Sequence, residues 1–334
     1  MSHDILKKFC FIGEVDCGKS TIAGHLYYLC GGVTKHELEQ VKKDLGNKKT
    51  QLWSALLDIY AEERERGKTN EFSTLSIKYN KTEYQLIDTP GHQIYIRSLI
   101  EGISQFNANE IIACLVLSAR SGEFEKGWLN GQTKEDIILA RGVGIRNLVV
   151  LINKMDTVNW SETEFKNICQ KVTPYIKKCK FESCQFIPVS GYDGIGLNNS
   201  DGLPIWYKEN KCLMEILQEI TIKVNPKINL EFPKSWTKME CHVQIVELKK
   251  PPIIAAGFSC ILHYQSEEYN VLFEEVSNLQ RDNIKFLKDK DVGKIIISSE
   301  IPIEKQETKN NTINLIFRSS ENTIAFGKIV KILS

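Results

Sequence analysis

The chain has 334 residues, a net charge of +1, and ordinary apolar and charged fractions of 42% and 25%. This length is enough for two domains with substantial cores. The balanced charge provides no overall basic field for nucleic acid, so we expect no DNA partner and only local contacts with any RNA.

The ten cysteines form no C-x-x-C pair, and histidines such as His36 and His92 have no zinc-like spacing to them. This pattern favours reduced, mostly buried thiols over a disulfide framework. No signal-like segment precedes the first predicted strand, and no apolar run is long enough to span a bilayer. We therefore expect a soluble, cytoplasmic protein without a membrane partner.

Predicted strands and helices alternate from residue 9 to about residue 222. An apolar helix is predicted over 21–29, and an amphipathic piece surrounds Leu52, Leu56, Leu57 and Tyr60. This alternation is typical of an α/β fold with a mostly parallel, doubly wound sheet. It predicts a first domain over residues 1–222. The predicted buried strands are 9–12, 84–87, 111–117, 148–152 and 185–189.

The pattern changes near Lys223. Residues 223–235 contain two prolines and little periodicity, which predicts a linker. Short strands then predict a small all-β barrel, or a sandwich, over 236–334. This part has thirteen basic and thirteen acidic residues, which favours a protein-binding module over a nucleic-acid-binding one. A barrel that only scaffolds is the alternative. The predicted strands are 241–246, 259–264, 271–273, 294–297, 312–317 and 323–333.

Residues 13–20 fit the pattern G-x-x-x-x-G-K-[ST] between a predicted strand and a predicted helix. Such a turn lets backbone N–H groups surround a β-phosphate, with the positive end of the helix dipole behind it. Lys19 is expected to reach the β- and γ-oxygens, and Ser20 to hold Mg²⁺. A glycine-rich turn without a ligand is the alternative. The predicted nucleotide-binding residues of this loop are Gly13, Asp16, Cys17, Gly18, Lys19, Ser20 and Thr21.

A second motif predicts which base is bound. Asn153-Lys154-Met155-Asp156 follows a predicted strand, and the Asp156 carboxylate can accept two hydrogen bonds from guanine N1 and its exocyclic amine. Asn153 is expected to bridge to the phosphate loop, and the stem of Lys154 to lie on the base. Backbone N–H groups of Ser190-Gly191-Tyr192, after the last strand, are expected to meet guanine O6. These residues predict GTP or GDP as the ligand.

A third group of residues predicts hydrolysis. Asp88-Thr89-Pro90-Gly91-His92 follows the predicted strand 84–87. Asp88 is expected to lie in the second shell of Mg²⁺, and Gly91 to offer its N–H to the γ-phosphate. His92 is the candidate that positions the attacking water; a purely structural histidine is the alternative. Thr69, in a charged loop before Asp88, is predicted to complete the Mg²⁺ shell with Ser20.

Together these motifs resemble the translational GTPases of the elongation factor 1-alpha and eukaryotic release factor 3 group. The resemblance covers residues 9–222 and resumes over about 238–334. Three details resemble release factor 3 more than elongation factor 1-alpha: Lys68, Ser118-Ala119-Arg120 and Val158-Asn159-Trp160-Ser161. The other matching segments are 18–21, 65–69, 88–92, 118–125, 131–133, 150–156, 256–258, 261–263 and 323–328.

The resemblance implies two barrels after the GTPase domain, whereas this chain has room for one. The last barrel is the one that it resembles, so the middle barrel is expected to be missing. In elongation factors the middle barrel helps to form the pocket for the aminoacyl end of tRNA, which makes tRNA delivery the weaker interpretation. The last barrel of release factor 3 is implicated in binding the class 1 release factor, and that contact is expected to survive.

Two phosphate-loop positions depart from the family. Glu14 stands where the family often has His, and Cys17 where Ser or Ala is usual. An inward-pointing Glu14 carboxylate would weaken nucleotide binding by about 1 kcal/mol, but we expect it to point into solvent. We expect Cys17 to be a small filler, with redox sensing as the alternative.

The sequence thus predicts a Mg²⁺-dependent GTPase of the release factor 3 type. Its expected activator is the ribosome, and its expected partner is a class 1 release factor bound through the C-terminal barrel. Two alternatives remain: a nucleotide-binding adaptor or decoy with little turnover, and a tRNA-delivery factor similar to elongation factor 1-alpha.

Overall fold

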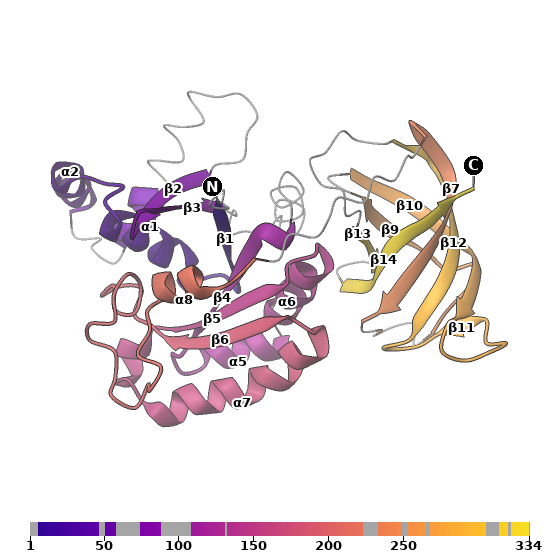
Figure 1. The fold of residues 1–334 in the computed structure, drawn as a ribbon. Coiled ribbons are helices and arrows are strands. Elements are labelled where there is room, and N and C mark those ends of the chain that lie inside the picture. Colours follow the sequence, from indigo (N-terminus) through magenta and orange to yellow (C-terminus); the bar gives the residue numbers. More distant parts are fainter. Residues whose placement is uncertain are drawn as a thin grey trace. The chain divides into compact units, whose positions relative to one another are not determined.

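The computed structural model describes residues 6–46, 51–57, 74–87, 108–130, 132–222, 233–246, 248, 253–264, 267–304, 314–319 and 322–333. The chain divides into two compact units, one containing a six-stranded sheet and the other a closed barrel (Figure 1). Within the described ranges, no helix is long and apolar enough to cross a lipid bilayer.

The sheet of the first unit has the strand order β2-β3-β1-β4-β5-β6. All neighbours are parallel except β2 and β3, which pair antiparallel. Every residue of β4 and β5 is buried, as expected for central strands covered on both faces. The predicted doubly wound sheet is confirmed. Its strands are β1 (Lys7–Ile12), β2 (Thr74–Tyr79), β3 (Thr82–Ile87), β4 (Ile111–Ser118), β5 (Asn147–Asn153) and β6 (Ser183–Pro188).

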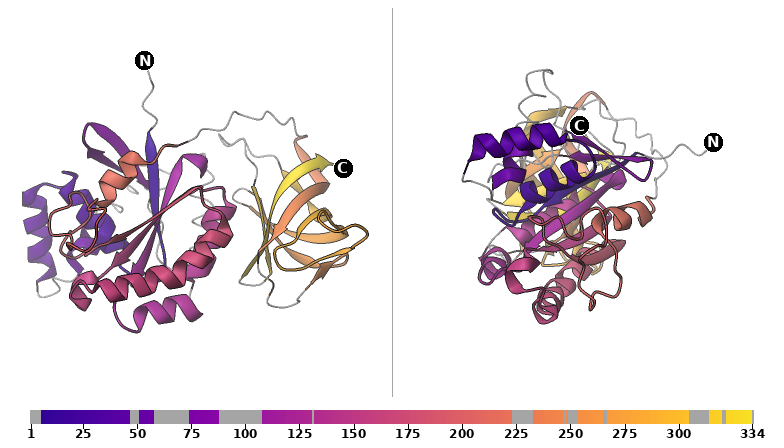
Figure 2. Two further views of the ribbon diagram at one scale, coloured as in Figure 1. Left: turned by 60° about the horizontal axis from the view of Figure 1, so that its bottom comes forward. Right: turned by 90° about the vertical axis from the view of Figure 1, so that its left-hand side faces the viewer.

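Helices cover the sheet on both sides. One face shares a core with α1 (Lys19–Leu29), the helical segment 51–57 and α8 (Leu213–Glu219). The long helix α7 (Glu162–Cys179) lies on the other face, where Figure 2 shows it in front. The remaining helical elements are α2 (Lys35–Leu45), η2 (Ala108–Glu110), α5 (Glu123–Glu125), η3 (Lys126–Asn130), α6 (Thr133–Gly142) and η4 (Met155–Val158).

Local sequence explains where several helices begin. The Thr34 hydroxyl accepts from Glu37 N–H and the Glu37 carboxylate from Thr34 N–H, so a capping box starts α2. The Ser161 hydroxyl caps α7 in the same way by accepting from Glu164 N–H. Helix α1 differs, because its N-cap is Gly18 in a left-handed conformation without a side-chain cap. The start of α1 therefore has no capping side chain over it, which leaves room there for an anionic ligand.

The second unit is a closed antiparallel barrel with the order β10-β12-β7-β14-β13-β9. Pairing of β9 with β10 closes it. Aromatic side chains fill the interior in edge-to-face pairs, Trp236 with Tyr264 and Phe273 with Phe317. The barrel strands are β7 (Ser235–Ile245), β9 (Ser259–Tyr264), β10 (Glu267–Asn278), β12 (Val292–Glu304), β13 (Asn314–Ser319) and β14 (Asn322–Ile332). A small sheet pairs β8 (Ile254–Ala255) with β11 (Phe286–Leu287).

The barrel, one of the two predicted architectures, is thus the one observed. The predicted domain boundaries at 1–222, 223–235 and 236–334 stay predictions, since residues 223–232 lie outside the described ranges.

Candidate guanine-nucleotide site

The loop between β1 and α1 depends on glycine at two positions. Gly13 has φ +136° and Gly18 has φ +103°, a backbone region that L side chains rarely adopt. A Cβ on Gly13 would overlap with the Val116 carbonyl oxygen, and one on Gly18 with the Asn153 side-chain amide. The loop therefore lies directly against β4 and against the residue that ends β5.

Lys19 bends back across this loop. Its ammonium group donates to the carbonyl oxygens of Gly13 at 2.7 Å and Glu14 at 2.8 Å. Ser20, which is exposed, and Thr21 follow in the first turn of α1. A hydroxyl oxygen there suits the hard cation Mg²⁺. The glycine-dependent turn, the lysine and the uncapped helix N-terminus fit a phosphate group together with its cation.

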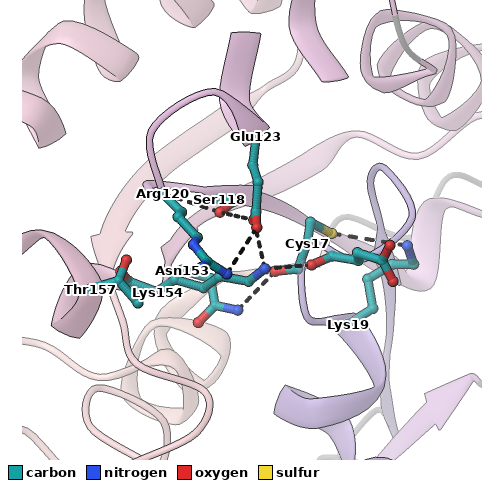
Figure 3. A network of polar contacts seen from close by, with 9 residues as sticks. Cys17, Lys19, Ser118, Arg120, Glu123, Asn153, Lys154 and Thr157 are labelled. Atoms are coloured by element: carbon teal, nitrogen blue, oxygen red, sulfur yellow. Dashed lines mark hydrogen bonds and ion pairs between the residues drawn. The ribbon is translucent and has the colours of Figure 1, made fainter. Parts of the chain in front are cut away.

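Asn153 joins three segments that are far apart in the sequence. Its side-chain amide donates to the Cys17 carbonyl oxygen at 2.9 Å, and its Oδ1 accepts from Gly191 N–H at 2.8 Å. Lys154 donates from Nζ to the Asp16 carbonyl oxygen at 2.7 Å. Figure 3 shows Asn153 and Lys154 facing the phosphate loop. The predicted bridge from Asn153 to this loop is present in the geometry.

The site is completed by Asp156 and by residues 190–192. We call residues 190–192 the base loop. Asp156 is half-buried, and its carboxylate makes no hydrogen bond or ion pair within the described ranges. Ser190 is buried and its hydroxyl donates to Asp193 Oδ2 at 2.9 Å. Tyr192 N–H has no acceptor among the described residues, whereas Tyr192 O does accept a bond. A free carboxylate and a free amide thus flank the place where a base is expected.

Glu123 lies beside Lys154, and sequence reasoning assigned it no role. Its Oε2 accepts from Lys154 Nζ at 2.6 Å and from the Ser118 hydroxyl at 2.8 Å. Burial raises the pKa of the Glu123 carboxyl, but the hydrogen bonds from Lys154 and Ser118 outweigh it, so that this pKa lies below its usual value. The only sequence signal was that Glu123 belongs to a segment carrying the family resemblance.

The expectation that Glu14 points into solvent is wrong. The Glu14 Oε2 accepts a 2.8 Å hydrogen bond from Gln132 N–H, just before α6. The unpaired N–H groups at a helix start attract a carboxylate, which explains this orientation. Glu14 therefore ties the phosphate loop to α6 and keeps its negative charge at the loop.

Asp136 of α6 was not predicted to matter. It is completely buried, and neither carboxyl oxygen makes a hydrogen bond of good geometry within the described part of the chain. Burial raises the pKa of Asp136 to about 8; the charge of Lys19 opposes this shift, and those of Glu14 and Glu135 add to it. At neutral pH this carboxyl therefore holds a proton next to the phosphate loop.

Cys17 is buried, and burial raises the pKa of its thiol to about 11. A protonated, inaccessible thiol reacts slowly with oxidants, which favours the small filler over the redox sensor. The predicted hydrolytic and metal-binding residues Thr69, Asp88, Gly91 and His92 lie outside the described residues.

A comparison of the sequence with models of protein families agrees with this geometry. The family model of the elongation factor Tu GTP binding domain matches residues 5–248. The chain belongs to this family. It is 38% identical over 427 aligned positions to the eukaryotic peptide chain release factor GTP-binding subunit of Ogataea pini, covering 97% of this chain and 56% of that protein. It is also 39% identical over 203 residues to elongation factor 1-alpha of Coccidioides immitis (strain RS), covering 59% and 43%.

The chain spans about half the length of the curated relatives it matches. The alignment with the release factor subunit is 427 positions long and the chain has 334 residues, so residues of that relative inside the aligned region lack a counterpart here. Among solved structures, the GTPase-like domain of Saccharomyces cerevisiae Ski7 has a TM-score of 0.72 at 16% identity, with 97% of both chains covered. This likeness supports the fold alone.

Proposed function

We propose that this member of the elongation factor Tu GTP-binding family binds GTP and GDP and hydrolyses GTP as a release factor 3-like switch. The observation that carries the proposal is the convergence of three segments at one end of the sheet. Asn153 and Lys154 contact the phosphate loop, and the base loop contacts Asn153. This is the arrangement by which a single pocket holds both the phosphates and the base.

Each residue has a proposed task. Lys19 and the N–H groups of residues 13–19 would hold the phosphates, and Asp156 would accept from guanine N1 and its exocyclic amine. Ser20 and Thr69 would hold Mg²⁺, with Asp88 behind them; the ion neutralises charge on the phosphates. Gly91 N–H would bind the γ-phosphate, and His92 would orient the attacking water. These last assignments rest on the sequence motif.

The proposed partners are the ribosome, as activator, and a class 1 release factor bound by the barrel. Support comes from the 38% identity to a release factor GTP-binding subunit over 97% of this chain. The balanced charge of the barrel also suits a protein partner. The aligned region of the release factor subunit contains residues without a counterpart here, which agrees with the proposed loss of the middle barrel and weakens the tRNA-delivery alternative.

A nucleotide-binding adaptor with little turnover is the second candidate. The observation that favours it is the charge of Glu14 beside the phosphate loop, because a fixed carboxylate there opposes the phosphates. Multiple-turnover phosphate release separates the two candidates. We expect GTP hydrolysis that accelerates when ribosomes and a class 1 release factor are added together. GTP binding with no turnover under those conditions would support the adaptor instead.

A further inference from the structure

Two aromatic rings outside the nucleotide motifs stack beside the base loop. His25 of α1 and Trp53 of segment 51–57 have ring centroids 3.7 Å apart and planes 9° from parallel. Both side chains are buried. A Cβ on Gly24 of α1 would overlap with the Trp53 carbonyl oxygen. Segment 51–57 can lie this close to α1 because glycine has no Cβ. The stack is therefore built from two elements in direct contact.

Each ring makes a hydrogen bond to the base loop. His25 Nδ1 lies 2.9 Å from the Gly191 carbonyl oxygen, and since a carbonyl only accepts, Nδ1 carries the proton. Burial lowers the pKa of His25, against the hydrogen bond to Gly191 and the charge of Asp193, so the ring is neutral at neutral pH. Trp53 donates from Nε1 to the Tyr192 carbonyl oxygen at 3.1 Å.

These two bonds hold the two peptide units on either side of Tyr192: the bond from His25 holds the 191–192 unit, and the bond from Trp53 holds the 192–193 unit. The Gly191 carbonyl and the Tyr192 N–H belong to one peptide unit, in which they point in opposite directions. The bond from His25 therefore aims Tyr192 N–H away from the imidazole. Asn153 Oδ1 holds Gly191 N–H at 2.8 Å. Gly191 N–H is therefore already paired, and Tyr192 N–H is the donor that remains for guanine O6. Its direction is set by neighbouring residues rather than by the loop alone.

We propose that His25 and Trp53 are positioning residues for guanine recognition, and that together they hold Tyr192 N–H in the orientation that receives guanine O6. This inference rests on the proposed nucleotide binding. A pair that only fills the core would stabilise the fold equally for every nucleotide, so the readout must separate O6 recognition from stability.

The test uses the nucleotide-free full chain and three nucleotides. GDP is compared with 6-thio-GDP, which differs only at position 6, and with IDP, which lacks the amine read by Asp156. Trp53→Phe and His25→Phe keep an aromatic ring and remove the donor. We expect GDP affinity to fall by roughly 5- to 30-fold, as for the loss of one buried hydrogen bond. The preference for GDP over 6-thio-GDP should shrink, while the preference over IDP stays unchanged.

A matched control and a rescue variant complete the test. Trp206 Nε1 also donates to a backbone carbonyl oxygen, that of Trp160, at 2.8 Å. Trp160 lies outside the base loop. Trp206→Phe should leave both preferences unchanged. His25→Asn restores a donor near the position of Nδ1 and should recover part of the preference for GDP over 6-thio-GDP.

The outcomes separate this inference from the proposed function. Wild-type protein that binds no GDP would overturn both. Wild-type protein that binds GDP, with variants that lose melting temperature but keep both preferences, overturns the positioning role alone. If His25→Phe does not fold, Trp53→Phe decides, since it changes only one edge of the stack. An unchanged 6-thio-GDP preference in that folded variant contradicts the inference.

Discussion

Lys154 Nζ lies 2.6 Å from Glu123 Oε2 and 2.7 Å from the Asp16 carbonyl oxygen, so one ammonium group joins α5, the phosphate loop and the end of β5. Arg120 adds a second cation to Glu123, with Nη1 3.4 Å from Oε1. This network holds the Lys154 stem, which is expected to lie on the base. We therefore expect the charge of Glu123 to influence nucleotide affinity without direct contact with the ligand.

Glu123→Gln should therefore raise the dissociation constant for GDP by about 3- to 10-fold, because a partly buried, hydrogen-bonded ion pair is lost. Isothermal titration measures this change. Glu125→Gln is the matched control, since Glu125 lies on the same short helix but pairs with the exposed Lys171. Equal effects of the two substitutions would contradict the role of Glu123.

The buried carboxyl of Asp136 should make the free energy of unfolding depend on pH. Its folded-state pKa, at about 8, lies above the ordinary 3.8, so the folded protein keeps a proton that the unfolded chain releases. This contribution is complete below pH 4 and is lost as pH rises to 8. Asp136→Asn should reduce the fall in unfolding free energy between pH 5 and pH 8 by at least about 1 kcal/mol.

Urea unfolding at several pH values measures this difference. Glu135→Gln, at the half-buried neighbouring position, is the comparison variant: it removes a charge that adds only a minor part of the Asp136 shift, so it should change the slope much less than Asp136→Asn. Identical pH dependence of wild type and Asp136→Asn would mean that the buried carboxyl titrates normally.

The charge of Glu14 makes a third prediction. Glu14→Gln keeps an acceptor for Gln132 N–H and removes the negative charge, so GTP affinity should rise by about 2- to 5-fold. GDP should gain less because it carries less charge. The gain should shrink as salt rises from about 0.05 M to 0.5 M. Weaker binding by the variant at low salt would show that the charge does not oppose the phosphates.

Much of the site could be predicted because its residues follow predicted strands. Asn153 and Ser190 come directly after buried runs, and the ends of neighbouring parallel strands meet at one edge of the sheet. The bond from Gln132 N–H to Glu14 joins residues 118 positions apart, and no local pattern indicates it. The role of Asp136 was also not predicted. Hydrophobic periodicity shows which face of a helix is apolar, but it does not show whether a polar group on that face has a hydrogen-bond partner.

The barrel strands illustrate the same limit. β9 has the predicted bounds, and most of its residues are buried, as its apolar run indicates. β10 extends from Glu267 to Asn278, well beyond the predicted 271–273, since exposed glutamates continue the strand on its solvent side. Hydrogen bonding to β9 and β12 keeps those residues in the strand. Local sequence does not indicate which strands pair, so the full length of β10 could not be predicted.

His92 makes a prediction about the chemical step. His92→Ala should leave GTP affinity within about twofold of wild type and lower ribosome-stimulated turnover by about 100-fold or more, since positioning of the water is lost. Single-turnover phosphate release with saturating ribosomes measures this. Stimulated turnover that survives the substitution would remove His92 from the mechanism.

The central claim is that Asp156 reads guanine in a pocket formed by the phosphate loop, Asn153 and the base loop. Competition titration of the nucleotide-free protein with GDP and xanthosine diphosphate tests it most directly. Wild type should prefer GDP, and Asp156→Asn should lose GDP affinity by about 100-fold or more and prefer the xanthine nucleotide, because an amide donates where the carboxylate accepted. An unchanged preference for GDP in Asp156→Asn would contradict the account.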